Sequence, residues 1–106
     1  MFFYVLQVFD TDYREDILLA LTSAGVKRAT VIDGTNFDKV LENEFPLFTG
    51  LFRGEDDRER FSQLIFGLID DEEVLSSVVK VLKQAGITNG EKEIYRLAVM
   101  KGEWKT

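Results

Sequence analysis

The sequence contains no cysteine and no histidine. The absence of cysteine excludes disulfide bonds, thiolate metal ligands and a thiol nucleophile. The absence of histidine removes the commonest general base, the commonest zinc ligand and the side chain that changes charge near neutral pH. Because no pair of catalytic carboxylates is recognisable either, the sequence predicts a protein that is not an enzyme.

Long hydrophobic runs are missing as well. No apolar segment approaches the roughly 20 residues that span a bilayer. The apolar start, Met1–Leu6, lacks the basic region and the cleavage signal of a secretory leader. We therefore expect a cytoplasmic protein with no direct insertion into a membrane. Its formal net charge of -6 also argues against nucleic acid as a partner.

What the chain does have is enough apolar residues, 45% of 106, to build a core. This length and composition predict one folded domain that spans residues 1–106. Four short segments are rich in β-branched and aromatic residues, as strands are. The predicted strands are Phe2–Phe9, Arg28–Asp33, Ser62–Ile69 and Ile94–Lys101.

Two helices are predicted between these strands. The first spans Asp12–Ala24 and ends at Gly25, and the second begins after Asp70 and ends at Gly86. Acidic residues at both starts can cap free backbone N–H groups and suit the positive end of the helix dipole. The acidic segment Asp70–Glu73 could instead bind Mg2+ or Ca2+, but capping explains four acids at a helix start more simply.

The two halves of the chain echo each other. Each has a strand, an acidic cap and a helix that ends in Ala-Gly-Val (24–26) or Ala-Gly-Ile (85–87). This repetition predicts two βαβ units. The order of elements, β-α-β-β-α-β, is that of the α+β ferredoxin-like fold, a four-stranded antiparallel sheet with two helices on one face.

Several of the predicted strands are apolar on both faces. In Ser62–Ile69, for example, Leu64, Phe66 and Leu68 lie opposite Ile65 and Ile69. Two helices can cover only one face of the sheet, and large apolar patches are unusual on monomers. The strand patterns therefore predict a closed homo-oligomer in which sheets of several subunits pack together.

The connection Thr35–Phe61 is too long for an ordinary loop. It contains the only proline and a cluster of large apolar side chains, and Phe37–Glu44 within it is compatible with a short helical turn. The apolar cluster consists of Phe45, Leu47, Phe48, Leu51 and Phe52. These side chains either pack against the protein and its neighbouring subunits, which is the commoner outcome, or form a partner surface.

The segment Leu18–Gly34 reads LLALTSAGVKRATVIDG. It resembles the helix-to-strand segment of nitrogen regulatory PII proteins and, more closely, of PII-like proteins. In that family the pattern A-L-x-x-x-G-(V/I)-x-G-x-T-V leads into a glycine turn and a long T-loop. The segment Asp70–Val74 and the helix after it resemble the second half of the family. The resemblance covers most of the chain in the order of its elements.

The resemblance implies a signal-transduction protein that forms a homotrimer and binds an adenine nucleotide in clefts between subunits. ATP, ADP or AMP with Mg2+ is the implied ligand. The T-loop, residues 35–61 here, changes shape with the ligand and acts on a partner protein, an enzyme or a membrane transporter. The ligand-binding residues implied by position are Gly34, Thr35, Leu64, Thr88, Gly90, Lys92 and Arg96. The partner-binding residues implied in the T-loop are Phe45, Phe48, Leu51, Phe52 and Arg53.

The stretch Gly86–Lys92 is the implied phosphate-binding B-loop, but it departs from the family pattern. The family has Gly-Asp-Gly-Lys, whereas Gly90–Glu93 lacks the second glycine and carries the lysine one position earlier. An ordinary turn with surface charges explains the segment at least as well as a phosphate site. The adjacent acids Glu91 and Glu93 would repel a phosphate unless Mg2+ intervened.

Two other families share the predicted fold. CutA-type divalent-cation tolerance proteins are also ferredoxin-like trimers, although the missing Cys and His argue against a copper role. ACT-like modules bind amino acids and regulate an attached enzyme, but their middle strands are joined by a short hairpin, unlike Thr35–Phe61.

Overall fold

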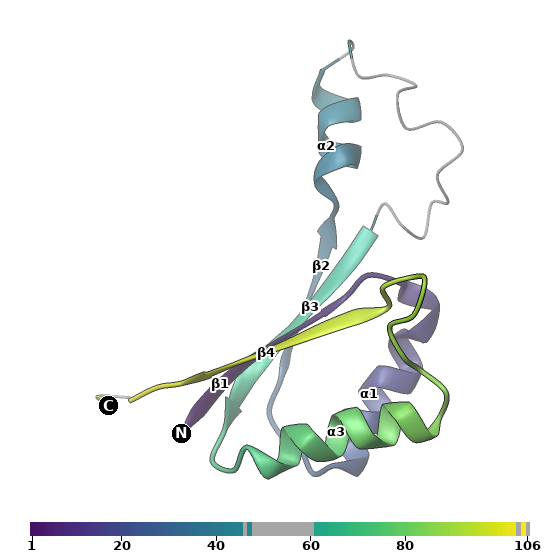
Figure 1. Cartoon of the computed structure of the whole chain (residues 1–106). Helices are drawn as coiled ribbons and strands as arrows, with labels where there is room; N and C mark the ends of the chain where they lie inside the picture. Colours follow the sequence, from purple (N-terminus) through teal and green to yellow (C-terminus); the bar gives the residue numbers. More distant parts are fainter. Residues whose placement is uncertain (46, 48–60, 104, 106) are drawn as a thin grey trace.

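The computed structural model describes residues 1–45, 47, 61–103 and 105 (Figure 1). Among these residues, four strands form one sheet, and three α-helices and the 3-10 helix η1 connect them. In chain order the elements are β1 (Phe2–Val8), the 3-10 helix η1 (Thr11–Tyr13), α1 (Arg14–Ser23), β2 (Thr30–Thr35), α2 (Phe37–Glu44), β3 (Phe61–Ile69), α3 (Glu73–Gln84) and β4 (Tyr95–Lys101).

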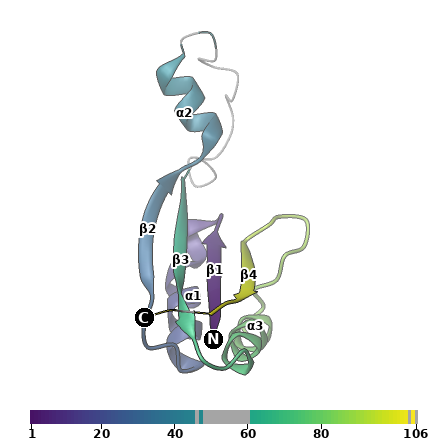
Figure 2. The same ribbon diagram turned by 90° about the vertical axis from the view of Figure 1, so that its left-hand side faces the viewer.

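The sheet has the strand order β2-β3-β1-β4, and every neighbouring pair is antiparallel. α1 and α3 lie together on one face of it (Figures 1 and 2). This arrangement confirms the predicted α+β ferredoxin-like fold. α2 is inserted between β2 and β3 and extends past the end of the sheet, away from α1 and α3.

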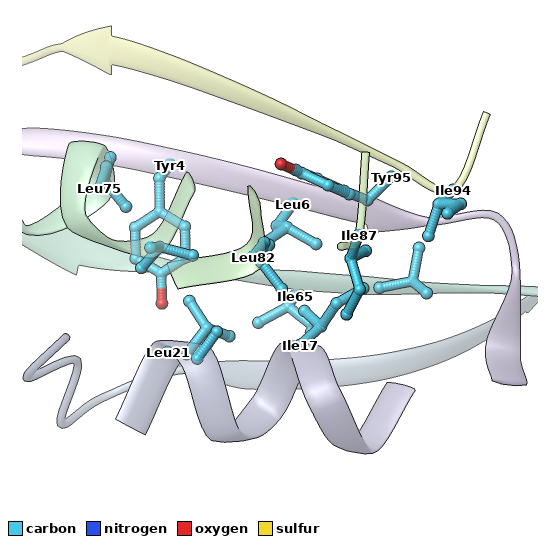
Figure 3. Packing of buried hydrophobic residues seen from close by; sticks show 13 residues of the cluster. Tyr4, Leu6, Ile17, Leu21, Ile65, Leu75, Leu82, Ile87, Ile94 and Tyr95 are labelled. Carbon is cyan, nitrogen blue, oxygen red and sulfur yellow. The ribbon is translucent and has the colours of Figure 1, made fainter. Parts of the chain in front are cut away.

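The core fills the space between the sheet and the two helices (Figure 3). Alternate residues of β1 point into it, so Tyr4, Leu6 and Val8 are fully buried. They pack with Ile65 of β3 and with the apolar stripes of both helices. Those stripes are Ile17, Ala20 and Leu21 of α1 and Leu75, Val78 and Leu82 of α3.

Both long helices end at the predicted glycines. Gly25 and Gly86 have φ of 95° and 80°, a left-handed conformation that costs least at glycine. After α1, the Val26 N–H donates to the Leu21 carbonyl at 3.0 Å, and after α3 the Ile87 N–H donates to the Leu82 carbonyl at 2.9 Å. The repeated Ala-Gly-Val/Ile motif thus forms the same helix end twice.

The other boundaries differ slightly from those predicted. The first helix starts with the 3-10 turn η1, whose N-cap Asp10 accepts a bond from the Asp12 N–H. β2 begins at Thr30, two residues after the predicted start, and the Arg28 carbonyl before it accepts a 3.4 Å hydrogen bond from the Tyr4 hydroxyl. β2 also continues through Gly34, which pairs with Ser62, to Thr35, so the predicted end of this strand at Asp33 was two residues short.

Candidate functional site

The face of the sheet opposite α1 and α3 is apolar across all four strands. Register places Phe3 of β1 between Leu68 of β3 and Met100 of β4, and the Phe3 and Phe66 rings lie 6.2 Å apart. We call this surface the open face. Its apolar residues are Phe3, Val5, Ile32, Leu64, Phe66, Leu68, Ala98 and Met100. Within the described part of the chain, no helix covers it.

The residues implied as ligand-binding lie at one end of the sheet but at its two opposite edges. Gly34 and Thr35 end β2, whereas Lys92 and Arg96 flank the start of β4. Because β3 and β1 run between these edges, three strand spacings of about 4.8 Å, or roughly 14 Å, separate them. A single chain therefore does not bring the two groups together. Leu64 lies between them on the open face.

Asn89 holds the turn before β4 in place. Its Nδ2 donates to the Tyr95 carbonyl at 2.7 Å, and its Oδ1 accepts from the Ile94 and Tyr95 N–H groups at 2.8 and 3.1 Å. These three bonds tie the turn at Asn89, between the exposed residues Thr88 and Gly90, to Tyr95, the first residue of β4. The Asn-Gly pair predicts a turn here, but nothing in the sequence alone predicts this use of the asparagine.

Both cations of the implied phosphate site are paired with carboxylates. The Lys92 Nζ lies 3.5 Å from Oδ2 of Asp10, whose side chain is only 6% exposed. Arg96 forms an ion pair with Glu93, three residues earlier in the chain. This set does not fit an unscreened triphosphate, since Asp10, Glu91 and Glu93 already outnumber the cations. A less charged ligand, or one neutralised by Mg2+, meets a lower electrostatic cost.

A polar pair lies at the base of the segment that connects β2 and β3. Gln63 is buried, and its Nε2 donates to Oδ1 of Asp33 at 2.6 Å. The Gln63 Oε1 is also buried and has no hydrogen-bond partner among the described residues. This pair joins β3 to β2 one residue before Gly34. Sequence reasoning missed it, because a lone glutamine in an apolar strand has no distinctive pattern.

The predicted partner-binding residues are only partly described. Phe37–Glu44 forms α2 as the sequence allowed, and Phe45 directly after it is half exposed. Leu47, which the sequence also placed in the apolar cluster, is 91% exposed. Phe48, Leu51, Phe52 and Arg53 lie outside the described residues.

A groove of about 790 Å³ lies at the far end of the sheet. Phe3, Phe66 and Leu68 of the open face line it, together with the neighbouring charged residues Arg28 and Asp70. None of the residues implied as ligand-binding borders this groove. It therefore extends the open face rather than the candidate ligand site.

Two further features bear on function. Among the described helices, none combines the length and hydrophobicity that crossing a bilayer requires. Residues 1–45, 47, 61–103 and 105 also contain no cluster of three or more acidic side chains arranged to hold a metal ion. Of the acids at Asp70–Glu73, Asp71 acts as the capping interpretation expects, since its Oδ1 accepts the Glu73 N–H at 2.9 Å.

Comparison with known proteins gives likeness in structure only. No protein-family model and no curated protein matches the chain. Among solved structures, a PII-like signaling protein from Thermus thermophilus superposes with a TM-score of 0.52 at 12% identity, over 93% of this chain and 84% of that one. CPII from Thiomonas intermedia, solved with ADP and bicarbonate, gives a TM-score of 0.49 at 15% identity, over 94% and 85%. The chain thus has the fold of a PII-like signaling protein, as its resemblance to that family predicted.

Proposed function

We propose that the chain is a PII-like regulatory protein of the cytoplasm, without enzymatic activity. Three copies form a trimer, and a small ligand binds in the clefts between them. The ligand changes the segment 35–61, which acts on a partner protein, an enzyme or a membrane transporter. The residues proposed for the cleft are those implied by the resemblance, from Gly34 and Thr35 to Lys92 and Arg96.

The single observation that carries this proposal is the position of these residues at opposite edges of the same sheet end. Within one chain the two groups are about 14 Å apart, so they cannot line a single cleft. A ring of copies that places the β2 edge of one subunit beside the β4 edge of the next would bring both groups together. The cleft would then exist only in the oligomer.

The open face supports the same assembly. Ile32 and Met100 are 48% and 56% exposed in the single chain, and apolar neighbours surround them on the other strands. Burying a large apolar side chain completely contributes about 1.5–3 kcal/mol. The partly exposed apolar side chains on this face give subunits a strong reason to pack their sheets together.

The ligand we propose is an adenine nucleotide, with ATP, ADP and AMP as the compounds to compare. Lys92 and Arg96 would face its phosphates, which then compete with Asp10 and Glu93 for the same cations. This competition favours AMP or ADP over free ATP and makes ATP binding dependent on Mg2+. A ligand in this position shifts the 35–61 segment only if it binds one of its conformations better than the other.

The first experiment measures the oligomer and its response to nucleotides. Mass from analytical ultracentrifugation should correspond to three chains. Replacing Phe66 on the open face by Glu should give a smaller species, because it places a charge in the apolar interface. The matched control is Leu19→Glu, since Leu19 is apolar and 65% exposed but lies on α1. A monomeric wild-type chain would overturn the proposal.

The same samples then show whether the cleft binds nucleotide. Binding to the native state adds about 2.7 kcal/mol of stability at a hundredfold excess over Kd, which the thermal midpoint reports. We expect a rise with AMP or ADP alone and with ATP only when Mg2+ is present. A trimer whose midpoint does not respond to any of the three would contradict the nucleotide assignment and leave the assembly in place.

A further inference from the structure

The groove at the far end of the sheet lies apart from the candidate ligand site. Its volume of about 790 Å³ is in the range of sites that bind small molecules. Phe3, Phe66 and Leu68, which are neighbours on the open face, give it an apolar surface. Two cations before β2 and two acids after β3 also line it; they are Lys27, Arg28, Asp70 and Asp71.

The groove forms where β2 stops pairing with β3. The last pair is Thr30 with Phe66, so residues 67–69 of β3 have no partner in β2 (Figure 1). Before Thr30 the chain turns toward the core, where the Arg28 carbonyl accepts the hydroxyl of Tyr4. Alternate residues of a strand turn their N–H and C=O groups to opposite edges. At least one of residues 67–69 therefore presents both groups at this open edge.

The charges beside the groove are available to a ligand. Within the described part of the chain, the side chains of Lys27, Arg28 and Asp70 form no hydrogen bond or ion pair, and all three are exposed. Continuing the strand register places Arg28 opposite Leu68, two residues before Asp70. One strand spacing across and two residues along give a backbone separation of roughly 8 Å. Two unpaired charges of opposite sign thus lie close together beside an apolar surface.

One class of small molecule complements all three features. A zwitterionic α-amino acid has a carboxylate for Arg28, an ammonium for Asp70 and a side chain for the apolar surface. Arginine suits a carboxylate in particular, because its guanidinium can donate two parallel hydrogen bonds. A purely apolar ligand leaves both charges without a partner. The open face of a second copy fits less well for the same reason, since it would remove charged side chains from water without pairing them.

We propose that this groove binds a free α-amino acid with a large apolar side chain, such as leucine or phenylalanine. The inference does not rest on the nucleotide cleft, because none of the residues proposed for the cleft borders the groove. The groove is open to solvent and its charges are exposed, so each contact is weak. We therefore expect a Kd for leucine in the millimolar range.

The experiment titrates the isotope-labelled full chain with leucine and follows the amide chemical shifts. The amides of residues 27–30 and 67–71 should shift, and those of Lys92 and Arg96 should not. Leucinamide lacks the carboxylate and N-acetylleucine lacks the ammonium, so each should bind about three- to fivefold more weakly. Glycine lacks the apolar side chain and should bind at least about tenfold more weakly. An absence of shifts at the groove, or equal binding of glycine and leucine, would overturn the inference.

Two variants assign the charges to the ligand's two ends. Arg28→Gln should weaken leucine about three- to fivefold and leave leucinamide unchanged, because leucinamide has no carboxylate to lose. Asp70→Asn should weaken leucine equally and leave N-acetylleucine unchanged. Lys80→Gln and Asp16→Asn remove exposed charges outside the groove and should keep Kd within about twofold. A variant that weakened every ligand alike would have damaged the groove's shape, and the assignment of its charge would be wrong.

Two remaining outcomes separate the groove from the assembly and from the nucleotide cleft. Met100→Glu places a charge on the open face outside the groove. If leucine shifted the groove amides only in this variant, a second copy would fill the groove in the assembled protein, and the inference would fail. If leucine bound while ATP, ADP and AMP left the thermal midpoint unchanged, the nucleotide assignment would fail and the amino-acid site would stand.

Discussion

The Asn89 side chain offers a direct test of how the turn before β4 is held. Asn89→Ala removes all three of its hydrogen bonds to Ile94 and Tyr95. A typical hydrogen bond contributes a net 0.5–1.5 kcal/mol. Asn89 itself is exposed, so water can replace part of what is lost. We therefore expect the variant to lose about 2 kcal/mol of unfolding free energy.

Thermal or urea unfolding at one fixed protein concentration measures this loss, because assembly makes stability depend on concentration. For a chain of this size, about 2 kcal/mol corresponds to a fall of roughly 8 °C in Tm. Amide exchange at Ile94 and Tyr95 should also accelerate, since their N–H groups lose the acceptor.

The matched control is Thr88→Ala, which changes the exposed neighbour of Asn89 and should stay within about 0.5 kcal/mol of the wild type. If Asn89→Ala cost no more than Thr88→Ala, the turn would be held by its backbone alone. The assignment of Asn89 as the residue that fixes this turn would then be wrong.

Two further predictions concern the end of the sheet near Arg28. Gly67→Ala would place a Cβ 2.7 Å from the Arg28 carbonyl oxygen, and we expect a loss of about 1–3 kcal/mol in the same unfolding assay; an unchanged Tm would refute this close approach. Burial raises the pKa of Tyr4 above its usual 10.0, so the unfolded chain ionises first and stability falls as pH rises above 10, by up to about 1.4 kcal/mol per pH unit. Tyr4→Phe should make this decline shallower, and an identical decline in wild type and variant would contradict the effect.

The fold could be predicted because its determinants are local. Period-two apolar patterns define the strands, and glycines at 25 and 86 define both helix ends through their left-handed backbone. The apolar pattern on both faces of β3 likewise predicted a sheet face without helix cover. Each of these features depends on residues a few positions apart, which a single sequence displays directly.

The details of the candidate site could not be predicted, because they depend on pairs far apart in the chain. Lys92 looked like a phosphate ligand in the sequence, yet it lies beside Asp10, 82 positions earlier. Gln63 and Asp33 meet only because β3 returns alongside β2 after a long connection. No local pattern indicates such partners, so the sequence identified the segments of the site without the charge balance inside them.

Because α2 leaves the sheet at the end of β2, a small change at that end moves the whole helix. An eight-residue helix is about 12 Å long. A rotation of about 20° at its start would therefore move its far end by roughly 4 Å. The N-cap of α2 is Asn36, directly after Thr35 at the proposed cleft. The Gln63–Asp33 hydrogen bond joins β3 to β2 two residues before Thr35. A ligand at Thr35 would thus need only a small local change to displace the far end of α2, at Glu44.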